Sequence, residues 1–323
     1  MVMRAVKVLM PGGSDMLKIV QVPIPVPRAE EVLIKVHSTA INRADILQRK
    51  GLYPPPIGTT DVLGLECSGV VAKGNGWWAE GTPVMGFLRG GGYAEYATVH
   101  KGHVLPMPSR MSFVEAAAVA EVWLTAYKCL KYIGKAQAGE TVLVHAGASG
   151  VGSALIQLGK YYGLKVLSTC GSDAKVKYCQ DLGADFVWNY KNGSFVEGFD
   201  GRSADLILDC VGKDYFEDNV KIIKKEGRWV VYGFLSGSKI QTDLGQIFGK
   251  LVQLNFTSFR SRTDEYREKV VKEFVQENLL EKFGHTFKSC VFKTIRLEDI
   301  SEGHDLMQNN ENSGKIVVKV ADF

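Results

Sequence analysis

Residues 142–160, which read VLVHAGASGVGSALIQLGK, constrain the fold more than any other stretch of the chain. An apolar run gives way to small residues, and an amphipathic run then begins, an order typical of a strand, a tight turn and a helix. Glycines at 147, 150 and 152 would let main-chain N–H groups at the helix start face an anion, where the helix dipole adds about half a positive charge. Pyrophosphate is the usual ligand of such a turn. The spacing exceeds G-x-G-x-x-G by one residue, so a turn that binds nothing is the alternative.

Strand-like and helix-like segments alternate from residue 141 onward. The strand-like segments read TVLVHA, KVLSTC, FVWNY, ADLILDC, RWVVYG and VQLNFTSF. This alternation predicts a doubly wound parallel sheet of the Rossmann type. Earlier runs such as EVLIKVHSTAI and GTPVMGFL predict a compact β-rich domain, and an alanine-rich helix is expected after the N-cap Ser112. The strands of the C-terminal tail are expected to rejoin that domain, so we predict one domain from 1–122 and 266–323 and another from 123–265.

Composition restricts the class of protein. A chain of 323 residues suggests two domains, and its net charge of +4 is spread without a basic stripe, which argues against dedicated nucleic-acid binding. No apolar run is long enough to span a bilayer, and the N-terminal MVMRAVKVLM lacks the apolar region of a signal peptide. The six cysteines include no C-x-x-C pair and are expected to be buried, reduced thiols. We therefore expect a cytoplasmic protein that does not contact membranes.

The end of the second strand of the alternating region predicts which dinucleotide binds. NAD-binding folds place an acidic residue there, whereas this chain reads CGSDAK, with Gly171 and Ser172. An acidic residue at this position would repel the 2′-phosphate of NADPH. Ser172 can donate a hydrogen bond to that phosphate, and Lys175 supplies a positive charge. Asp173 is expected to cap the helix 174–182. Tyr190, which ends the third strand, could contact the same phosphate. These residues predict NADPH; a solvated Lys175 and a core Tyr190 are the alternatives.

Several motifs occur in the order expected of one family. They read INRADILQRKGLYPPP, LGLECSGVV, GGYAEYATV, WLTAYKCL, HAGASGVGSALIQL and GSDAKVKYCQDLGAD. Together they resemble the medium-chain dehydrogenase/reductase superfamily and most closely its zinc-independent NADPH:quinone oxidoreductase family, related to zeta-crystallin. LILDCVG, DGRSADL, GRWVVYG and FTSFRSRTDEY are similar to the animal tumour-suppressor-inducible branch of that family. The resemblance implies a GroES-like catalytic domain, a Rossmann domain, NADPH in the cleft between them, and a homodimer formed through edge strands such as VQLNFTSF.

The resemblance also implies site residues. Asn42 and Tyr53 would be catalytic and face the nicotinamide and the substrate. The cofactor-binding set would be Asn42, Thr125, Gly147, Ser149, Gly150, Val151, Gly171, Ser172, Lys175, Tyr190, Gly233, Phe234, Ser258 and Arg260. No metal is expected: GLE places Leu65 where zinc enzymes of the superfamily have histidine, Asn42 lies where their first cysteine ligand falls, and no cysteine lies between Cys67 and Cys129.

The expected reaction is hydride transfer from NADPH to a quinone, with ortho-quinones favoured. A quinone is already electrophilic, so the site must mainly align the reactants and exclude water. Tyr53 is predicted to form a wall of the pocket and donate a hydrogen bond to the acceptor; a surface tyrosine packed on prolines is the alternative. Asp45 and Glu66 are predicted to be structural, and Arg262 to pair with Asp264 or Glu265.

Two other functions stay open on the sequence. One is an NADPH-dependent reductase of enone or alkenal double bonds on the same fold. The other is an NADPH-binding structural or RNA-binding protein, as in crystallin relatives, with little turnover.

Overall fold

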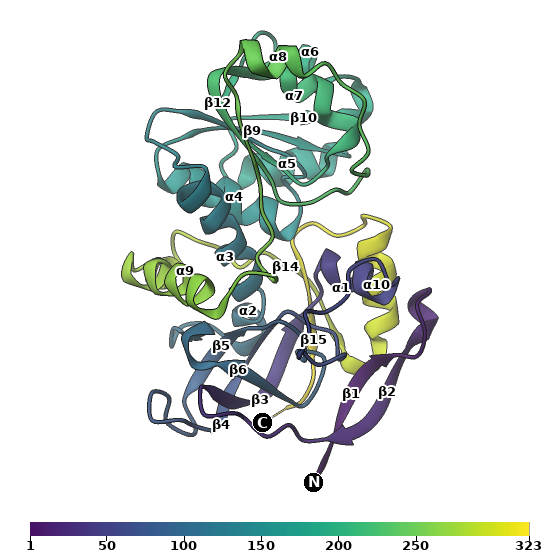
Figure 1. Cartoon of the computed structure of the whole chain (residues 1–323). Helices are drawn as coiled ribbons and strands as arrows, with labels where there is room; N and C mark the ends of the chain where they lie inside the picture. The colour runs from purple at the N-terminus through teal and green to yellow at the C-terminus, as the bar shows by residue number, and fades with distance from the viewer. Residues whose placement is uncertain (323) are drawn as a thin grey trace. The chain divides into compact units, whose positions relative to one another are not determined.

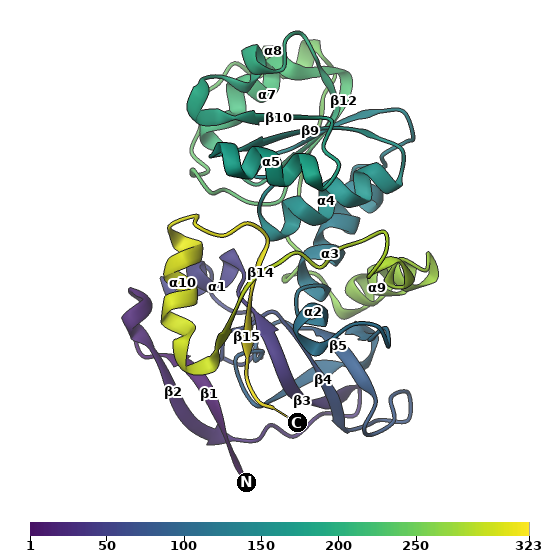
Figure 2. The ribbon, with the colours of Figure 1, turned by 180° about the vertical axis from the view of Figure 1, so that it is seen from behind.

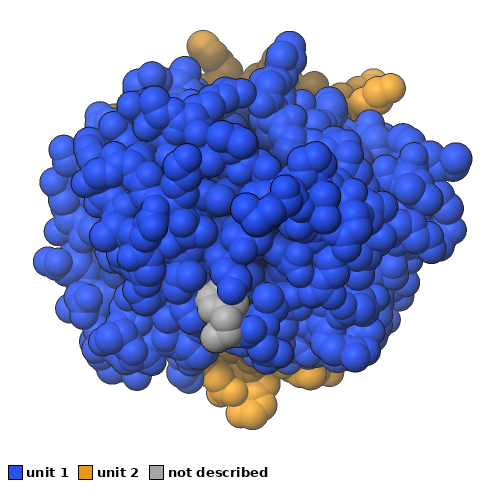
Figure 3. Space-filling model, turned by 90° about the horizontal axis from the view of Figure 1, so that it is seen from below, with its two compact units in different colours: residues 1–124, 260–323 blue, residues 125–259 orange. Residues whose placement is uncertain are grey.

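The computed structural model describes residues 1–322 and divides into two compact units. Unit 1 comprises Met1–Leu124 and Arg260–Phe323, and unit 2 comprises Thr125–Phe259 (Figure 3). No helix in the described part of the chain is long and apolar enough to cross a membrane.

Unit 1 is built on a seven-stranded, mostly antiparallel sheet and a separate two-stranded hairpin (Figure 1). Its strands are β1 (Val2–Val8), β2 (Leu17–Pro23), β3 (Glu31–Ala40), β4 (Glu66–Lys73), β5 (Pro83–Phe87), β6 (Tyr96–His100), β7 (Val104–Pro106), β14 (Val291–Arg296) and β15 (Lys315–Lys319). Its helices are α1 (Arg43–Arg49), α2 (Phe113–Ala116), α9 (Asp264–Gln276) and α10 (Ile300–Gln308), and α3 (Ala120–Tyr127) runs across the division between the units. The large sheet has the order β14-β15-β3-β4-β5-β7, with β6 paired to β3.

The C-terminal tail completes the sheet of unit 1. β15 pairs antiparallel with β3, from Val317 opposite Ala40 to Lys319 opposite Ser38. Ile34 and Val36 of β3 share one buried apolar cluster with Ile316 and Val318 of β15. Burial of these side chains holds the two ends of the chain in one core.

Unit 2 contains a six-stranded parallel sheet with the order β10-β9-β8-β11-β12-β13. Its strands are β8 (Thr141–Val144), β9 (Lys165–Cys170), β10 (Phe186–Asn189), β11 (Ala204–Asp209), β12 (Ile223–Val231) and β13 (Gln253–Phe256). Its helices are α4 (Gly150–Tyr161), α5 (Asp173–Asp181), α6 (Phe195–Gly198), α7 (Phe216–Ile222) and α8 (Leu244–Gly249). This is the Rossmann strand order 3-2-1-4-5-6, whose direction of winding reverses between β8 and β11.

Helices cover both faces of this parallel sheet. α4 and α5 lie on one face, and α7 and α8 lie on the other (Figure 2). Val142, Leu143 and Val144 of the central strand β8 are fully buried, as expected for a strand enclosed on both sides. The predicted α/β class, with a Rossmann sheet and a β-rich second unit, is confirmed.

Two predicted elements differ from the structure. The alanine-rich stretch after Ser112 is divided into α2, α3 and a π-helical segment, Lys128–Ile133. Ser112 caps α2 as predicted, but the N–H groups of Ala118 and Val119 then bond three residues back, to Glu115 and Ala116, which interrupts the helix. The strand predicted over VQLNFTSF is shorter and ends at Phe256.

Candidate active site

The turn after β8 is packed so tightly that only glycine fits at two positions. A Cβ on Gly147 would collide with the Ser168 hydroxyl, and one on Gly152 would collide with the Ala146 carbonyl. Ala146 has a φ of 52°, in the left-handed region that is uncommon for a residue with a side chain. The backbone of this turn is therefore held close to the start of α4.

Helix α4 starts with its N-cap in place. The Ser149 hydroxyl oxygen accepts a hydrogen bond from the Gly152 N–H at 3.0 Å. Gly150 and Val151 are the first two residues of the helix, so helical geometry offers their N–H groups no partner within it. Two N–H donors at the positive end of the helix dipole fit the oxygens of a pyrophosphate.

A second set of predicted residues meets at the ends of β9 and β10. These strands are parallel neighbours, with Cys170 opposite Asn189, which brings the segments that follow them together. A Cβ on Gly171 would collide with the Tyr190 hydroxyl, so Gly171 and Tyr190 are in close contact. The Ser172 hydroxyl oxygen accepts the Lys175 N–H at 3.3 Å, and its own hydrogen stays available to an anion.

One prediction about this loop is wrong. Ser172, rather than Asp173, is the N-cap of α5. The Asp173 carboxylate instead accepts a hydrogen bond from the Asn189 side chain at 2.8 Å. This contact ties the acidic group to the end of β10, which accounts for an aspartate beside a predicted phosphate site.

Other predicted cofactor residues follow the remaining strands. Gly233 and Phe234 come after β12, and Ser258 comes two residues after β13. Because all six strands are parallel, these residues lie at the same carboxyl edge as the glycine turn. Thr125 is buried on α3.

In unit 1, Asn42 is held by a buried ion pair. The Lys315 ammonium lies 2.7 Å from the Glu66 carboxylate and donates a hydrogen bond to the Asn42 side-chain oxygen, also at 2.7 Å. The Asn42 amide nitrogen donates to Glu66 at 3.0 Å and to the Ala40 carbonyl at 3.3 Å. Both of its N–H bonds are therefore used, and Asn42 has only a lone pair of its oxygen left to offer a ligand.

A buried hydrogen-bond chain lies beside Asn42. The Asp45 carboxylate accepts the Asn42 N–H at 2.8 Å, the Gly64 N–H at 3.1 Å and the Tyr93 hydroxyl at 3.0 Å. Burial raises the pKa of Asp45 to about 6. These contacts confirm the structural role predicted for Asp45.

The chain continues through Tyr93 to a buried histidine. His304 lies 3.1 Å from the Tyr93 oxygen through Nε2 and 3.3 Å from an Arg49 nitrogen through Nδ1. Arginine can only donate, so Nδ1 accepts and Nε2 carries the hydrogen. Burial, with the nearby Arg49 charge, lowers the pKa of His304 to about 3.

Tyr53 and Arg260 lie together in unit 1. The Arg260 guanidinium carbon is 5.4 Å from the centre of the Tyr53 ring, and Tyr53 is half-buried. The ion pair predicted for Arg262 is wrong: within residues 1–322, Asp264 pairs with Arg89 at 3.2 Å. The guanidinium carbon of Arg262 instead lies 4.9 Å from the centre of the Tyr266 ring.

The donor set does not fit a zinc ion. Among residues 1–322, no three His, Cys, Asp or Glu side chains are grouped so that they could hold a metal. Leu65 offers no ligand atom, and burial raises the pKa of the Cys67 thiol to about 12, which disfavours the thiolate that binds zinc.

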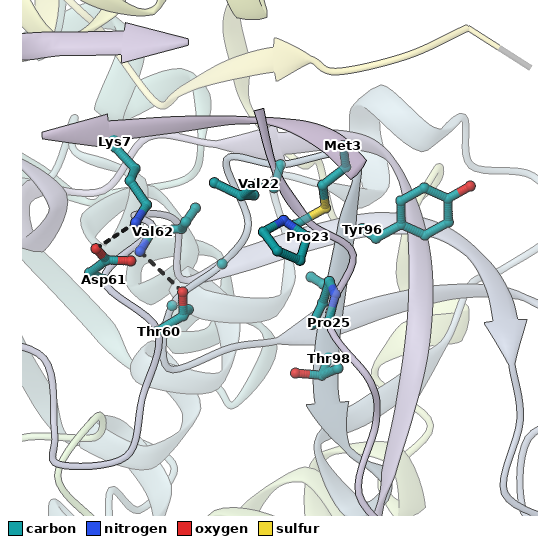
Figure 4. A pocket seen from close by; sticks show the side chains of 14 residues that line it. Met3, Lys7, Val22, Pro23, Pro25, Thr60, Asp61, Val62, Tyr96 and Thr98 are labelled. Atoms are coloured by element: carbon teal, nitrogen blue, oxygen red, sulfur yellow. Dashed lines mark hydrogen bonds and ion pairs between the residues drawn. The ribbon is translucent and has the colours of Figure 1, made fainter. Parts of the chain in front are cut away.

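A hollow of about 250 Å³ lies elsewhere in unit 1, between the β1–β2 hairpin and residues 60–62 and 90–98. Figure 4 shows Met3, Val22 and Pro23 at its wall, together with the ion pair between Lys7 and Asp61 at 2.9 Å. The charged groups here already neutralise each other. We assign no ligand to this hollow.

Comparison with known proteins places the chain in a family. The family model described as the alcohol dehydrogenase GroES-like domain matches residues 28–109, and the one described as zinc-binding dehydrogenase matches residues 150–276. The mouse quinone oxidoreductase is 31% identical over 98% of this chain and 97% of its own length. The chain belongs to the quinone oxidoreductase family. This confirms the family, and with it the medium-chain dehydrogenase/reductase superfamily, predicted from the motifs; the resemblance to the tumour-suppressor-inducible branch stays a prediction.

Solved structures similar to this family member agree in fold. A mycobacterial protein solved in complex with NADPH has a TM-score of 0.87 and 26% identity, over 98% of this chain and 100% of that one. The CurK enoyl reductase also has a TM-score of 0.87 and 26% identity, over 99% of both chains.

Sequence reasoning missed the partners that hold this family member's predicted residues. Lys315, Tyr93 and His304 were not singled out, although each is buried and contacts Asn42 or Asp45 directly or through one side chain. Lys315 lies in a short apolar strand, KIVVK, where a charge that faces inward is the one signal that could have marked it.

Proposed function

We propose that this protein is an NADPH-dependent quinone oxidoreductase that works without zinc. The observation that carries the proposal is the carboxyl edge of the unit 2 sheet. The glycine turn, the first N–H groups of α4, and the cluster of Gly171, Ser172 and Tyr190 all follow strands at this edge, which supports binding of a dinucleotide with a 2′-phosphate. The mouse quinone oxidoreductase and the NADPH-bound mycobacterial protein support the acceptor and the cofactor.

Each predicted domain, whose bounds differ slightly from those of unit 1 and unit 2, has its own role in this proposal. Residues 123–265 form the dinucleotide-binding domain, and residues 1–122 with 266–323 form the catalytic and substrate domain. Gly147, Ser149, Gly150 and Val151 hold the pyrophosphate, whereas Gly171, Ser172, Lys175 and Tyr190 hold the 2′-phosphate. Thr125, Gly233, Phe234 and Ser258 border the rest of the cofactor.

NADPH supplies a hydride when it is bound. Asn42 can only accept a further hydrogen bond, so it orients the carboxamide N–H group or a ribose hydroxyl rather than a carbonyl. The Lys315–Glu66 ion pair prevents the Asn42 amide from flipping, because a flip would place its NH₂ group against the ammonium. Tyr53 provides an aromatic wall for the acceptor.

The 2′-phosphate site is tested by Lys175→Met, with Lys177→Met as the matched control. Both lysines are on α5, but Lys177 is exposed and pairs with Asp181 at 3.4 Å. We expect Lys175→Met to raise the KM for NADPH about 10- to 100-fold, the loss typical of one charge-assisted contact. The KM for NADH should stay within threefold (roughly 0.7 kcal/mol). Equal effects on both cofactors would remove Lys175 from the phosphate site.

The acceptor is tested by NADPH oxidation with 9,10-phenanthrenequinone. NADH and a simple enone serve as parallel controls. Oxidation of NADPH by the quinone alone supports the proposal. The CurK enoyl reductase has the same fold, so a double-bond reductase is the second candidate, and oxidation by the enone alone would establish it. Tight NADPH binding without turnover of either would indicate a structural or RNA-binding protein.

We also propose a homodimer formed along β13. This strand is the last of the six-stranded sheet, and its far side has no neighbour within the described chain. Phe256, at its end, is 61% exposed, and Phe248 on the preceding α8 is 79% exposed. An unpaired strand edge with apolar groups beside it suits pairing with a second copy.

A further inference from the structure

Arg260 is a buried cation with unused hydrogen-bond donors. It is 5% exposed, and its Nε–H donates to the Arg89 carbonyl at 2.7 Å. Within residues 1–322, neither Nη1 nor Nη2 has a hydrogen-bond partner, and no carboxylate is within ion-pair distance. Leaving a charged donor group buried and unpaired is costly, so these four N–H bonds are expected to meet a ligand.

The surroundings of Arg260 carry excess positive charge. Arg267 is 1% exposed, donates to the Phe87 and Leu88 carbonyls, and leaves its own Nε without a partner in the described chain. Burial, followed by the charge of Arg89, lowers the pKa of Arg267 to about 9. The carboxylate of Asp264 is engaged by Arg89. The ligand that suits this cluster therefore carries or develops negative charge.

The Tyr53 ring next to Arg260 indicates which class of anionic ligand fits this site. The Arg260 guanidinium lies over this ring, with its carbon 5.4 Å from the ring centre, so a planar fork of donors lies next to an aromatic side chain. A phosphate would accept hydrogen bonds from the guanidinium but would not pack against the Tyr53 ring. A planar aromatic molecule with two oxygens on neighbouring carbons would use both, because the parallel N–H bonds of a guanidinium match paired oxygens.

We propose that Arg260 and Tyr53 form a clamp that binds the two adjacent oxygens of an ortho-quinone and stabilises the negative charge they acquire. This inference rests on the proposed quinone reductase function and reassigns Arg260, predicted above to contact the cofactor, to the substrate. A para-quinone has its oxygens on opposite sides of the ring, so one fork can bind only one of them. The clamp therefore selects ortho-quinones.

The charge balance of the reaction agrees with this role. Bound NADPH would supply a hydrogen with two electrons and would be left as NADP⁺. One quinone oxygen gains an O–H bond, the ring becomes aromatic, and the other oxygen keeps the negative charge of a hydroquinone monoanion. A proton from solvent then completes the hydroquinone. Arg260 donates to both oxygens during the step in which the charge develops.

The test compares Arg260→Lys with Arg262→Lys. Lysine keeps the positive charge but lacks the planar fork, and Arg262 is an exposed arginine two residues away that does not contact Tyr53 in the described chain. We expect Arg260→Lys to lower kcat/KM for 1,2-naphthoquinone about 10- to 100-fold. The value for 1,4-naphthoquinone and the Kd for NADPH should each change less than about threefold, or roughly 0.7 kcal/mol. Arg262→Lys should leave all three unchanged.

A binding measurement separates this inference from the proposed function. 4-Nitrocatechol has two adjacent oxygens and 4-nitrophenol has one, and the absorbance of each reports whether it binds as an anion. Wild-type protein should bind 4-nitrocatechol at least tenfold (about 1.4 kcal/mol) more tightly than 4-nitrophenol, and Arg260→Lys should remove that preference. If no quinone is reduced but this preference is found, the clamp stands and the proposed reaction fails.

Three results would overturn the clamp. A weaker Kd for NADPH with equal losses for both quinones would assign Arg260 to the cofactor. Equal losses with an unchanged Kd would make its role structural. Equal binding of 4-nitrocatechol and 4-nitrophenol by wild-type protein would exclude the clamp even if Arg260→Lys does not fold.

Discussion

At the scale of single residues, several polar groups of unit 1 are joined into buried networks. Asn42 belongs to two of them, through Lys315 and Glu66 on one side and through Asp45, Tyr93 and His304 on the other. Such groups cost little while paired and much when a partner is lost. Substitution of one of these partners should therefore lower the free energy of unfolding strongly. The loss should depend on pH where the partner titrates.

Removal of Lys315 should destabilise the protein strongly. Lys315→Met leaves the fully buried Glu66 carboxylate without its cation, and we expect a loss of about 3–5 kcal/mol in the free energy of unfolding. Lys319→Met is the control, because Lys319 pairs with Asp322 at the surface and should cost about 1 kcal/mol or less. Urea denaturation measures both, and a second change, Glu66→Gln, should recover part of the loss. Equal costs for the two lysines would contradict the prediction.

His304 should make the protein sensitive to acid. Its pKa is near 3 in the folded state and near the ordinary 6.5 when unfolded, so the unfolded chain binds one more proton between these values. Stability due to His304 is present above pH 6.5 and is lost as the pH falls toward 3. Relative to His304→Gln, wild type should lose roughly 3 kcal/mol between pH 6.5 and 4. The buried Asp45 changes stability in the opposite direction, since its raised pKa favours folding at low pH, but it is present in both proteins and cancels.

The measurement is urea unfolding across this pH range. His285→Asn, at an exposed histidine, serves as the control and should follow the wild-type pH dependence. If His304→Gln and wild type lose stability in parallel, His304 is not the group responsible.

At the scale of elements, the glycine turn shows packing overriding helix propensity. Gly152 is in the first turn of α4, where alanine would favour the helix by about 1 kcal/mol. Its Cβ would, however, meet the Ala146 carbonyl, so we expect Gly152→Ala to cost about 1–3 kcal/mol and to weaken NADPH binding. Gly249→Ala, at the end of α8 with nothing within 4 Å of the added Cβ, should be neutral or slightly stabilising. Thermal unfolding with and without NADPH checks both, and a neutral Gly152→Ala would show that the turn can relax.

At the scale of the whole molecule, the proposed dimer depends on backbone groups of β13. The Thr257 N–H bonds to Val231 of β12, so alternation along the strand points the N–H of Phe256 toward the free edge. Phe256→Pro removes that N–H donor. Phe256→Ala removes the phenyl ring but keeps the N–H donor. We expect the proline variant to raise the dimer Kd at least tenfold (about 1.4 kcal/mol), whereas the alanine variant stays mostly dimeric in sedimentation analysis. Equal effects would mean that the side chain, rather than the strand edge, holds the dimer.

The sequence by itself determined the fold class, the family and the local elements that make the nucleotide edge. Alternating strands, the glycine turn of 147–152 and the missing acidic residue after β9 are local patterns, and their backbone geometry follows from neighbouring residues. Contacts between residues far apart in the chain could not be predicted from the sequence. The continuous helix expected after Ser112 is broken, and Ser172 caps α5 in place of Asp173, because packing and a contact from Asn189 decide those details.

Only the tertiary structure brought Asn42 against the buried ion pair of Glu66 and Lys315 and left Arg260 beside Tyr53 with unpaired donors. These residues are separated by up to 273 positions along the chain. Whether each charge is paired or unpaired is decided only when the chain has folded. The physical reason is that burial and pairing of a charge are properties of a place in the fold, which no spacing along the sequence encodes.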